Sequence, residues 1–396
     1  MVYFFTMLSE RARRLRPSPT LAIDSRAKAL KAQGVDVINL GVGEPDFDTP
    51  EHIKEAARRA IRDGFTKYTP VGGILALKEA IAETFQAEQG VHYTPQQVLV
   101  SCGAKHSLYN IFQVLLQEGD EVLIPIPYWV SYPEQVALAG GRPVFVPTAR
   151  EEGFRLEPQV LREHIGPRVK ALVLNYPSNP TGLTYDRAAL EAVAQVALEH
   201  GLVIISDEIY EKLLYDGLSH VSIASLGPEL REKTVVVNGV SKAYAMTGWR
   251  IGWALGPEEL IKAMTALQSQ STSNPTSIAQ VAALEALRGP QEPLQQMLRE
   301  FDARRRYLVE ALNALEGFRC SLPQGAFYVF PHTQALYGER FSGSEELALY
   351  LLEQARVALV PGAAFGADGH LRLSYATALE ELKRAVQRIA EALRAC

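Results

Sequence analysis

Apolar and polar positions along the first three quarters of the chain alternate in a way that predicts strands separated by helices. Short β-branched runs between turn residues predict buried strands at 98–101, 122–125, 143–146, 171–175, 203–206 and 234–238. Apolar positions with helical spacing predict helices at 75–89, 104–117 and 187–200. Strands that alternate with helices of this length are typical of a mostly parallel sheet covered on both faces. We therefore predict an α/β unit over roughly residues 46–289.

The pattern changes after residue 290. A long charged stretch predicts a helix at 292–315, and short apolar runs predict strands at 326–330, 358–360 and 371–374. The last predicted helix carries Leu382, Val386, Ile389 and Leu393 on one face. This region therefore predicts a smaller α+β unit.

Composition excludes several classes of protein. The chain has 396 residues, a net charge of −5 and 47% hydrophobic residues, which is typical of a globular protein and lacks the basic excess of a nucleic-acid scaffold. The three cysteines (Cys102, Cys320 and Cys396) are far apart, which favours a reducing, cytoplasmic compartment over a disulfide framework. No two of the eight histidines have the spacing of a zinc site, so we expect no metal.

Two segments with few charges are candidate membrane or signal segments, and neither has the required pattern. The uncharged stretch 263–284 is rich in Ser, Thr, Gln and Asn and contains Pro275, so we expect no membrane span there. The apolar residues 1–7 are too short for a signal peptide and lack a basic region and a cleavage site. Translation from Met7 is an alternative that leaves Met1–Thr6 out of the native protein.

Unusual segments follow three of the predicted strands, at the edge where a parallel sheet places its ligand. Asn179 and Asp207 follow two of them, and Lys242 follows the third. A lysine in an apolar neighbourhood can have a lowered pKa and form a Schiff base, although an exposed loop lysine is the alternative. Asp207 could pair with a protonated pyridine nitrogen, and Tyr210 and Asn179 could reach a phenolic oxygen on the same ring. Asn179 is also typical turn chemistry.

Two further segments indicate anion binding. Gly103 lies between a strand and a helix, where backbone N–H groups and the helix dipole favour a phosphate, and Arg250 adds a fixed guanidinium. Arg372 stands alone among apolar residues of a short predicted strand. If it points inward it suits a carboxylate, and if it points outward it is a solvent-facing charge on an edge strand.

Five segments in order resemble the class I aminotransferases that use pyridoxal phosphate. They are Gly-Glu-Pro-Asp-Phe (43–47), Ser-Asn-Pro-Thr-Gly (178–182), Ser-Asp-Glu-Ile-Tyr (206–210), Ser-Lys-Ala-Tyr-Ala-Met-Thr-Gly-Trp-Arg-Ile-Gly (241–252) and Gly-Ala-Phe-Tyr (325–328). The resemblance is strongest to the bacterial aspartate aminotransferase branch, which includes enzymes that also act on prephenate. It implies a type I fold of aspartate-aminotransferase kind, with an N-terminal arm at 7–18, a small domain at 19–45 and 290–396, and a large cofactor domain at 46–289.

The resemblance also implies a role for each matching residue. Lys242 would link to pyridoxal phosphate and move the substrate proton, while Asp207 would hold the pyridinium proton and Tyr210 and Asn179 the ring oxygen. Trp129 would stack on the ring, although core packing is an equally good interpretation. The phosphate would lie against Gly103, Ala104, Lys105 and Arg250, and Tyr68 would reach the phosphate of a neighbouring subunit, so a homodimer is implied. Gly43 and Arg372 would bind the substrate α-carboxylate.

The implied reaction passes the amino group of L-aspartate to 2-oxoglutarate in ping-pong fashion, with prephenate as a further substrate. Lys105 would bind the distal carboxylate, helped by Ser18 and Thr20, although Lys105 could instead support the phosphate and the other two could cap a helix or form a turn. Aromatic or alanine aminotransferases and β-lyases share the main residues and stay open as alternatives.

A nucleotide-binding oxidoreductase is the alternative from another class, because α/β alternation permits one. Gly41-Val-Gly43 is followed by Asp46 where a dinucleotide-binding turn needs a third glycine. The sequence also lacks a phosphate-loop signature. We therefore expect amino-acid and 2-oxo-acid substrates, with neither a nucleic acid nor a membrane as partner.

Overall fold

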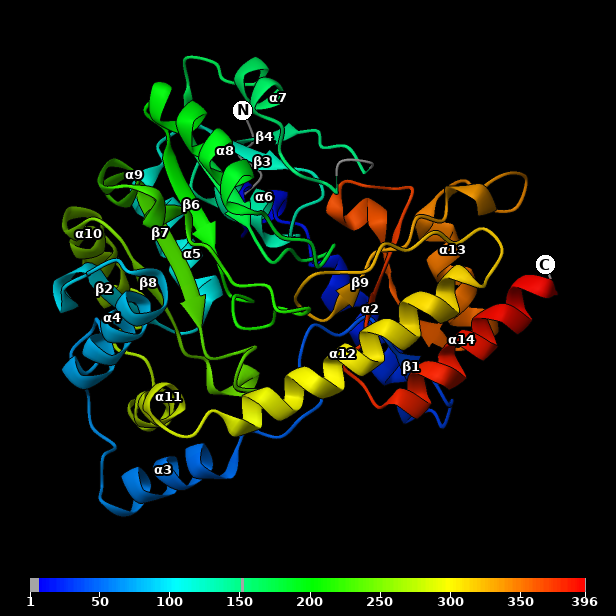
Figure 1. Cartoon of the computed structure of the whole chain (residues 1–396), viewed down its shortest axis with the longest axis horizontal. Coiled ribbons are helices and arrows are strands. Elements are labelled where there is room, and N and C mark those ends of the chain that lie inside the picture. The colour runs from blue at the N-terminus through cyan, green and yellow to red at the C-terminus, as the bar shows by residue number, and fades with distance from the viewer. Residues whose placement is uncertain (1–6, 151–152, 396) are drawn as a thin grey trace.

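A seven-stranded sheet forms the centre of the larger part of the molecule (Figure 1). The computed structural model describes residues 7–150 and 153–395, so Met1–Thr6 lie outside the described residues. The strands are β2 (Val98–Ser101), β3 (Glu121–Pro125), β4 (Arg142–Val146), β5 (Val169–Asn175), β6 (Val203–Asp207), β7 (Thr234–Gly239) and β8 (Gly252–Leu255). The spatial order is β2-β8-β7-β6-β5-β3-β4.

The structure confirms all six predicted strands of the sheet and adds one that the sequence analysis missed. The neighbouring strands β4, β3, β5, β6 and β7 are parallel, whereas β8 is antiparallel to both β7 and β2. The missed strand reads Gly-Trp-Ala-Leu, which is short and begins with a glycine, so its local pattern is weak. Its pairing with two buried neighbours makes it a strand.

Helices cover both faces of this sheet because successive strand residues point to opposite sides. The helices are α3 (Glu51–Arg62), α4 (Leu75–Gln89), α5 (Ala104–Leu115), α6 (Ser131–Leu138), α7 (Pro158–Glu163), α8 (Arg187–Glu199), α9 (Pro228–Lys233), α10 (Glu258–Ser269) and α11 (Ser277–Arg288). Val122 and Ile124 of β3 pack with residues of α5, α6 and α10, while Leu123 packs with α7 and α8 on the other face. The three predicted helices are confirmed, with α5 and α8 slightly shorter than expected.

The smaller part of the molecule contains two short sheets and four longer helices. In one sheet β1 (Ile38–Asn39) pairs with β10 (Val357–Ala358), and in the other β12 (Leu371–Ser374) lies between β11 (Val360–Pro361) and β9 (Tyr328–Val329). The helices are α2 (Pro19–Ala32), α12 (Glu292–Asn313), α13 (Ser344–Tyr350) and α14 (Leu379–Arg394). Leu382, Val386 and Ile389 of α14 are buried as predicted.

Two predicted strands in this part were wrong in extent. The stretch 326–330 forms a strand only at β9, because Ala326 has a φ of +57° and belongs to a turn. The stretch 358–360 is divided between β10 and β11, which belong to different sheets. Both differences depend on backbone turns and on pairing with distant strands, which no local apolar pattern records.

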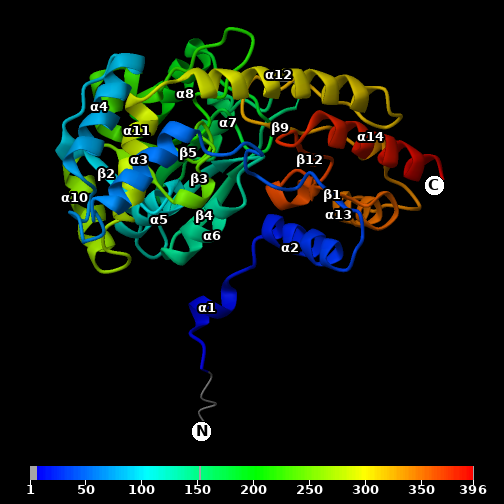
Figure 2. The ribbon, with the colours of Figure 1, turned by 90° about the horizontal axis from the view of Figure 1, so that it is seen from below.

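Residues from both ends of the chain build the smaller part, and α12 runs from the larger part into it (Figures 1 and 2). Helix α1 (Glu10–Arg14) has no buried residue and projects away from the rest of the chain (Figure 2). The division into an arm at 7–18 and two domains stays a prediction. None of the helices in the described part of the chain is long and apolar enough to cross a membrane.

Candidate active site

A cavity of about 550 Å³ lies at the carboxyl ends of β5, β6 and β7, where the smaller part meets the sheet. Most of the predicted site residues line it: Thr20, Gly43, Ala104, Lys105, Trp129, Asn179, Asp207, Tyr210, Lys242, Arg250 and Arg372. Of the predicted residues, Gly103, Ser18 and Tyr68 are not among those that line the cavity. Asn179, Asp207 and Lys242 converge here as the parallel topology predicts, whereas Thr20, Gly43 and Arg372 come from the smaller part.

Lys242 follows β7 and points into this cavity. Its Nζ donates a hydrogen bond of 2.5 Å to the backbone oxygen of Gly43. The pKa of Lys242 is lowered to about 8, chiefly by burial; the charge of Glu44 opposes this shift, and those of Arg250 and Arg372 add to it. An exposed loop lysine is thus the wrong interpretation, since the structure presents a partly desolvated amine that is readily neutral and nucleophilic.

Asp207 is the last residue of β6 and is only 4% exposed. The hydroxyl of Tyr132 donates to its Oδ2 at 2.7 Å, and the Ile209 N–H donates to its Oδ1 at 3.3 Å. Burial raises the pKa of Asp207 to about 6, although the hydrogen bond from Tyr132 opposes this rise. At neutral pH the carboxylate is mostly ionised, which suits the binding of a cationic N–H in the cavity.

Arg372 lies on β12 and points inward, being 2% exposed. It donates to Asn179 Oδ1 at 2.9 Å and to the Gly41 oxygen at 2.6 Å, while its Nε has no hydrogen-bond partner. Within residues 7–150 and 153–395 no carboxylate pairs with it, and burial lowers its pKa. The solvent-facing interpretation is therefore wrong, and the site offers a buried guanidinium with capacity for an anion.

A second anion site lies where α5 begins. Gly103 precedes this helix with a φ of +87°, and a Cβ at that position would lie 2.2 Å from Arg250 Nη2. Arg250 has a φ of +56° and is held by hydrogen bonds to the Thr247 and Cys102 oxygens at 2.8 and 3.3 Å. The guanidinium and the positive end of α5 thus occupy one corner of the cavity, an arrangement that favours a phosphate.

Lys105, the second residue of α5, and residues of α2 also line the cavity. Lys105 Nζ lies 4.8 Å from the centre of the Trp129 ring, which packs edge to face on Tyr132. Thr20 lines the cavity, and the Ser18 hydroxyl lies 2.9 Å from the Thr20 hydroxyl. Ser18 stands at the N-terminus of α2 without a side-chain capping bond, so capping does not account for its hydroxyl.

Tyr68 does not line the cavity of its own chain. It is 91% exposed, unusually high for a tyrosine. A role in the same chain's site is excluded by this position, whereas a role in a neighbouring subunit is neither shown nor contradicted.

Two tyrosines are among the cavity residues that the sequence analysis missed. Tyr132 lies in the segment that contains Trp129, and Tyr328 ends the Gly-Ala-Phe-Tyr segment, so both were visible in motifs without an assigned role. Their signal is weak because buried tyrosines are common core residues. Only their hydrogen bonds to Asp207 and Tyr210 identify them as part of the site.

One group of possible metal ligands exists among the described residues, behind the cavity rather than in it. Donor atoms of Glu208, Glu211 and His220 lie within 4.8 Å of one another. The Glu208 carboxylate already accepts hydrogen bonds from the Ser206 and Ser222 hydroxyls, both at 2.7 Å, and lies 2.9 Å from His220 Nε2. We interpret this group as a buried hydrogen-bond network beneath β6.

The sheet is mostly parallel, and its carboxyl edge brings together a lysine, a carboxylate and two arginines suited to anions. This combination is typical of the aspartate-aminotransferase fold. The chain belongs to the aminotransferase class I and II family, whose model matches residues 35–389. It is 56% identical to the aspartate aminotransferase of Geobacillus stearothermophilus, over 96% of this chain and 98% of that protein.

Further relatives agree with this assignment. The chain is 52% identical to the aspartate/prephenate aminotransferase of Cereibacter sphaeroides, over 96% of this chain and 97% of that protein. The structure of the aspartate aminotransferase of Thermus thermophilus with maleate superimposes with a TM-score of 0.93 at 49% identity, covering 98% of this chain and all of that chain. The fold and the enzyme class predicted from the sequence are confirmed.

Proposed function

We propose that this aminotransferase transfers the amino group of L-aspartate to 2-oxoglutarate, producing oxaloacetate and L-glutamate, with pyridoxal phosphate as cofactor. The observation that carries the proposal is a single cavity in which a lysine with a pKa of about 8 lies between an anion site at the start of α5 and a buried arginine without a carboxylate partner. The relatives named above support the choice of aspartate.

The residues present fit the proposed cofactor. The corner between Arg250 and Gly103, where a Cβ would collide with the guanidinium, suits its phosphate. Asp207 would hold its ring nitrogen, and Tyr210 and Asn179 its ring oxygen. The bound cofactor supplies the electron sink that makes the α-proton of an amino acid acidic.

The remaining work falls to side chains of this chain. Arg372 binds the substrate α-carboxylate, because its Nε is unpartnered and its charge is unmatched within the described chain. Lys242 serves as the base that removes and returns the α-proton, since burial lowers the pKa of its amine to about 8 and so raises the fraction that is neutral at physiological pH. Trp129 and Tyr132 form one wall of the cavity, with their rings packed edge to face.

The distal carboxylate of a dicarboxylic substrate would meet Lys105, with Thr20 and the neighbouring Ser18 assisting. Prephenate, which also carries two carboxylates, is the second candidate substrate, and the name of the Cereibacter relative supports it. Aromatic amino acids and alanine lack the second carboxylate and should be poorer donors.

We also propose a cytoplasmic homodimer. Tyr68 is 91% exposed and would reach the phosphate site of the neighbouring subunit, so that each cavity is completed across the interface. A Tyr68→Phe variant should bind pyridoxal phosphate more weakly, and sedimentation of the wild type should give about twice the 43.6 kDa of one chain.

Steady-state kinetics with aspartate, glutamate, alanine, phenylalanine and prephenate on one preparation test the function. Aspartate with 2-oxoglutarate should give the highest kcat/KM of the amino donors, and the protein should absorb visible light. Lys242→Ala should abolish transamination and leave the cofactor bound noncovalently, whereas Lys262→Ala, a surface control paired with Glu258, should match the wild type. Full activity of Lys242→Ala would contradict the assignment.

A further inference from the structure

Tyr328 has both ends of its side chain engaged by residues of the cavity. It lies on β9 and is 1% exposed. Its hydroxyl lies 2.8 Å from the hydroxyl of Tyr210, and its ring lies 4.5 Å from the guanidinium carbon of Arg372. We propose that Tyr328 is a positioning residue whose hydroxyl orients Tyr210 and whose ring holds Arg372 in place. The proposal deepens the proposed function and rests on it.

The hydroxyl of Tyr328 can direct the proton of Tyr210. A tyrosine hydroxyl has one proton, so if Tyr210 donates that proton to an anionic oxygen in the cavity, the bond between the two tyrosines must run from Tyr328 to Tyr210. Such a chain of hydrogen bonds strengthens the outer donation. Gly43 leaves room for this arrangement, because a Cβ there would lie 2.7 Å from the Tyr328 hydroxyl oxygen.

The ring of Tyr328 helps to stabilise the charge of Arg372, which has no carboxylate partner among the described residues. The guanidinium lies between two aromatic rings, with Tyr328 at 4.5 Å and Phe365 at 5.1 Å from its central carbon. Its two hydrogen bonds go to neutral oxygen atoms of Asn179 and Gly41. Aromatic faces attract a cation without consuming its donors, so the guanidinium is fixed while its free N–H stays available for a carboxylate.

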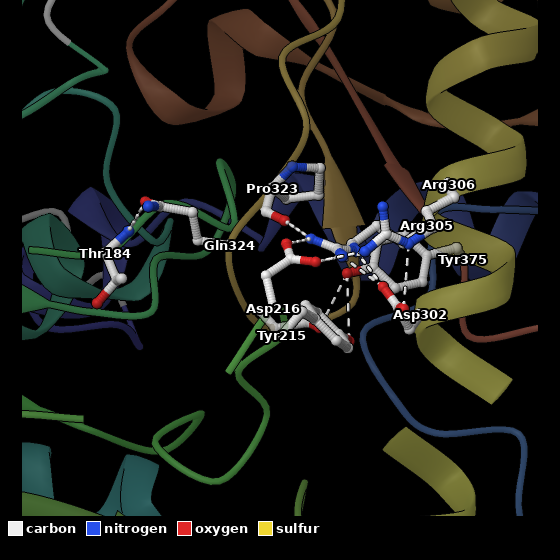
Figure 3. Close-up of polar contacts among 10 residues, drawn as sticks. Thr184, Tyr215, Asp216, Asp302, Arg305, Arg306, Pro323, Gln324 and Tyr375 are labelled. Atoms are coloured by element: carbon white, nitrogen blue, oxygen red, sulfur yellow. Dashed lines mark hydrogen bonds and ion pairs between the residues drawn. The ribbon is translucent and has the colours of Figure 1, made fainter. Parts of the chain in front are cut away.

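A network outside the cavity holds the turn that carries Tyr328 (Figure 3). Arg305 of α12 donates to the Pro323 oxygen at 2.6 Å, and the Thr184 N–H donates to the Gln324 side chain at 3.2 Å. The hydroxyl of Tyr375 donates to the Ala326 oxygen at 3.0 Å, and that of Tyr215 reaches the same oxygen. The turn is thus held from several directions, which leaves Tyr328 little freedom to leave its two partners.

Two substitutions separate the two ends of the side chain. Tyr328→Phe keeps the ring and the volume and removes the hydroxyl, whereas Tyr328→Leu removes both. Tyr93→Phe is the matched control, because Tyr93 is 1% exposed, lies outside the cavity and has a hydroxyl without a hydrogen-bond partner. Each holoenzyme is titrated with pH while its visible absorbance is followed, and with maleate in a calorimeter.

Tyr328→Phe should move the pH midpoint of the absorbance change upward by about 0.3 to 1 unit, since Tyr210 then stabilises the anionic ring oxygen less. Its maleate Kd should stay within about twofold of wild type. Tyr328→Leu should raise the maleate Kd, and KM for aspartate, by about 3- to 30-fold, because the guanidinium loses one ring. Tyr93→Phe should change neither quantity.

An unchanged pH midpoint in Tyr328→Phe, or a maleate Kd in Tyr328→Leu within twofold of wild type, overturns the proposal. Changes as large in Tyr93→Phe also overturn it, because they would reflect general packing. Failure of the proposed function looks different, since a wild type that does not transaminate aspartate overturns the substrate assignment. The ratios for Tyr328 are then taken with the donor that the wild type uses best.

Discussion

Two of the three buried arginines in the described part of the chain, Arg305 and Arg372, have surroundings that differ in kind. Arg305, 0% exposed, is held by Asp216 and Asp302 and by the Pro323 oxygen. Among the residues that the structure describes, Arg372, which is 2% exposed, has two neutral oxygen acceptors and two aromatic rings as its partners. The carboxylates raise the pKa of Arg305 against the effect of burial, whereas burial lowers the pKa of Arg372.

The difference separates a structural charge from a functional one. Burying a cation is costly unless opposite charge and hydrogen bonds compensate for its lost hydration. Arg305 receives this compensation within the fold and joins α12 to the loop at Asp216 in the larger part and to the turn at Pro323 in the smaller part (Figure 3). Arg372 receives only part of it, so a ligand carboxylate completes its environment. The unmatched charge lowers the stability of the folded state, and the same charge leaves the site ready to bind an anion.

Removal of Arg372 has the largest expected effect of the changes considered. Arg372→Leu should lower kcat/KM for aspartate by about 10³-fold or more, because a buried, charge-assisted contact to the α-carboxylate is lost. Its urea stability without ligand should equal or exceed that of the wild type, since an unmatched buried charge disappears. Arg372→Lys, which keeps the charge without the planar fork, is the matched control and should recover only part of the activity. A fall in kcat/KM of less than tenfold in Arg372→Leu would contradict the functional role that distinguishes Arg372 from Arg305.

Removal of Arg305 should act mainly on stability. Arg305→Leu removes charge-assisted hydrogen bonds to Asp216, Asp302 and the Pro323 oxygen, so the free energy of unfolding in urea should fall by about 3 kcal/mol. The neighbouring Arg306 binds the same two carboxylates from the surface, so Arg306→Leu should cost less than about 1 kcal/mol. Equal losses of unfolding free energy in the two variants would show that the buried arginine contributes no more to stability than the exposed one.

Asp207 offers a third buried charge, of opposite sign. Its folded pKa of about 6 lies above its ordinary value of 3.8, so ionisation destabilises the fold fully above pH 6 and not at all below about pH 4. In cofactor-free protein, Asp207→Asn should therefore be more stable than the wild type at pH 8, by about 3 kcal/mol at most. Urea unfolding at pH 8 and pH 5 tests this, and the advantage should shrink at pH 5. If the extra stability of Asp207→Asn instead grew towards low pH, the pKa of Asp207 in the folded protein would not be raised.

Lys105 should have the smallest effect, because its side chain is exposed to the cavity and to solvent. Lys105→Ala should raise KM for aspartate by about fivefold, in line with the modest energy of exposed ion pairs, and leave KM for alanine within about twofold. Steady-state kinetics with both donors on one preparation measure the ratio. Equal increases would instead assign Lys105 to support of the phosphate.

Much of this site could be predicted without coordinates because its chemistry is tied to strand ends. Asn179, Asp207 and Lys242 follow parallel strands, and strands that repeat with helices between them deliver their carboxyl ends to one edge. The short strand β8 and the split of β10 from β11 could not be predicted, because pairing with distant strands decides them. Tyr328 and Tyr132 were equally hidden, since a buried tyrosine in a core and one in a cavity have the same local pattern.

The sequence by itself determined the α/β class, the motifs of the family and the identity of the groups that could carry chemistry. It did so because periodicity and turn residues are local properties of the chain. Only the tertiary structure decided that Arg372 points inward without a carboxylate while Arg305 is paired, and that burial brings the Lys242 pKa to about 8. Burial and charge pairing depend on residues hundreds of positions apart, so they exist only after the chain has folded.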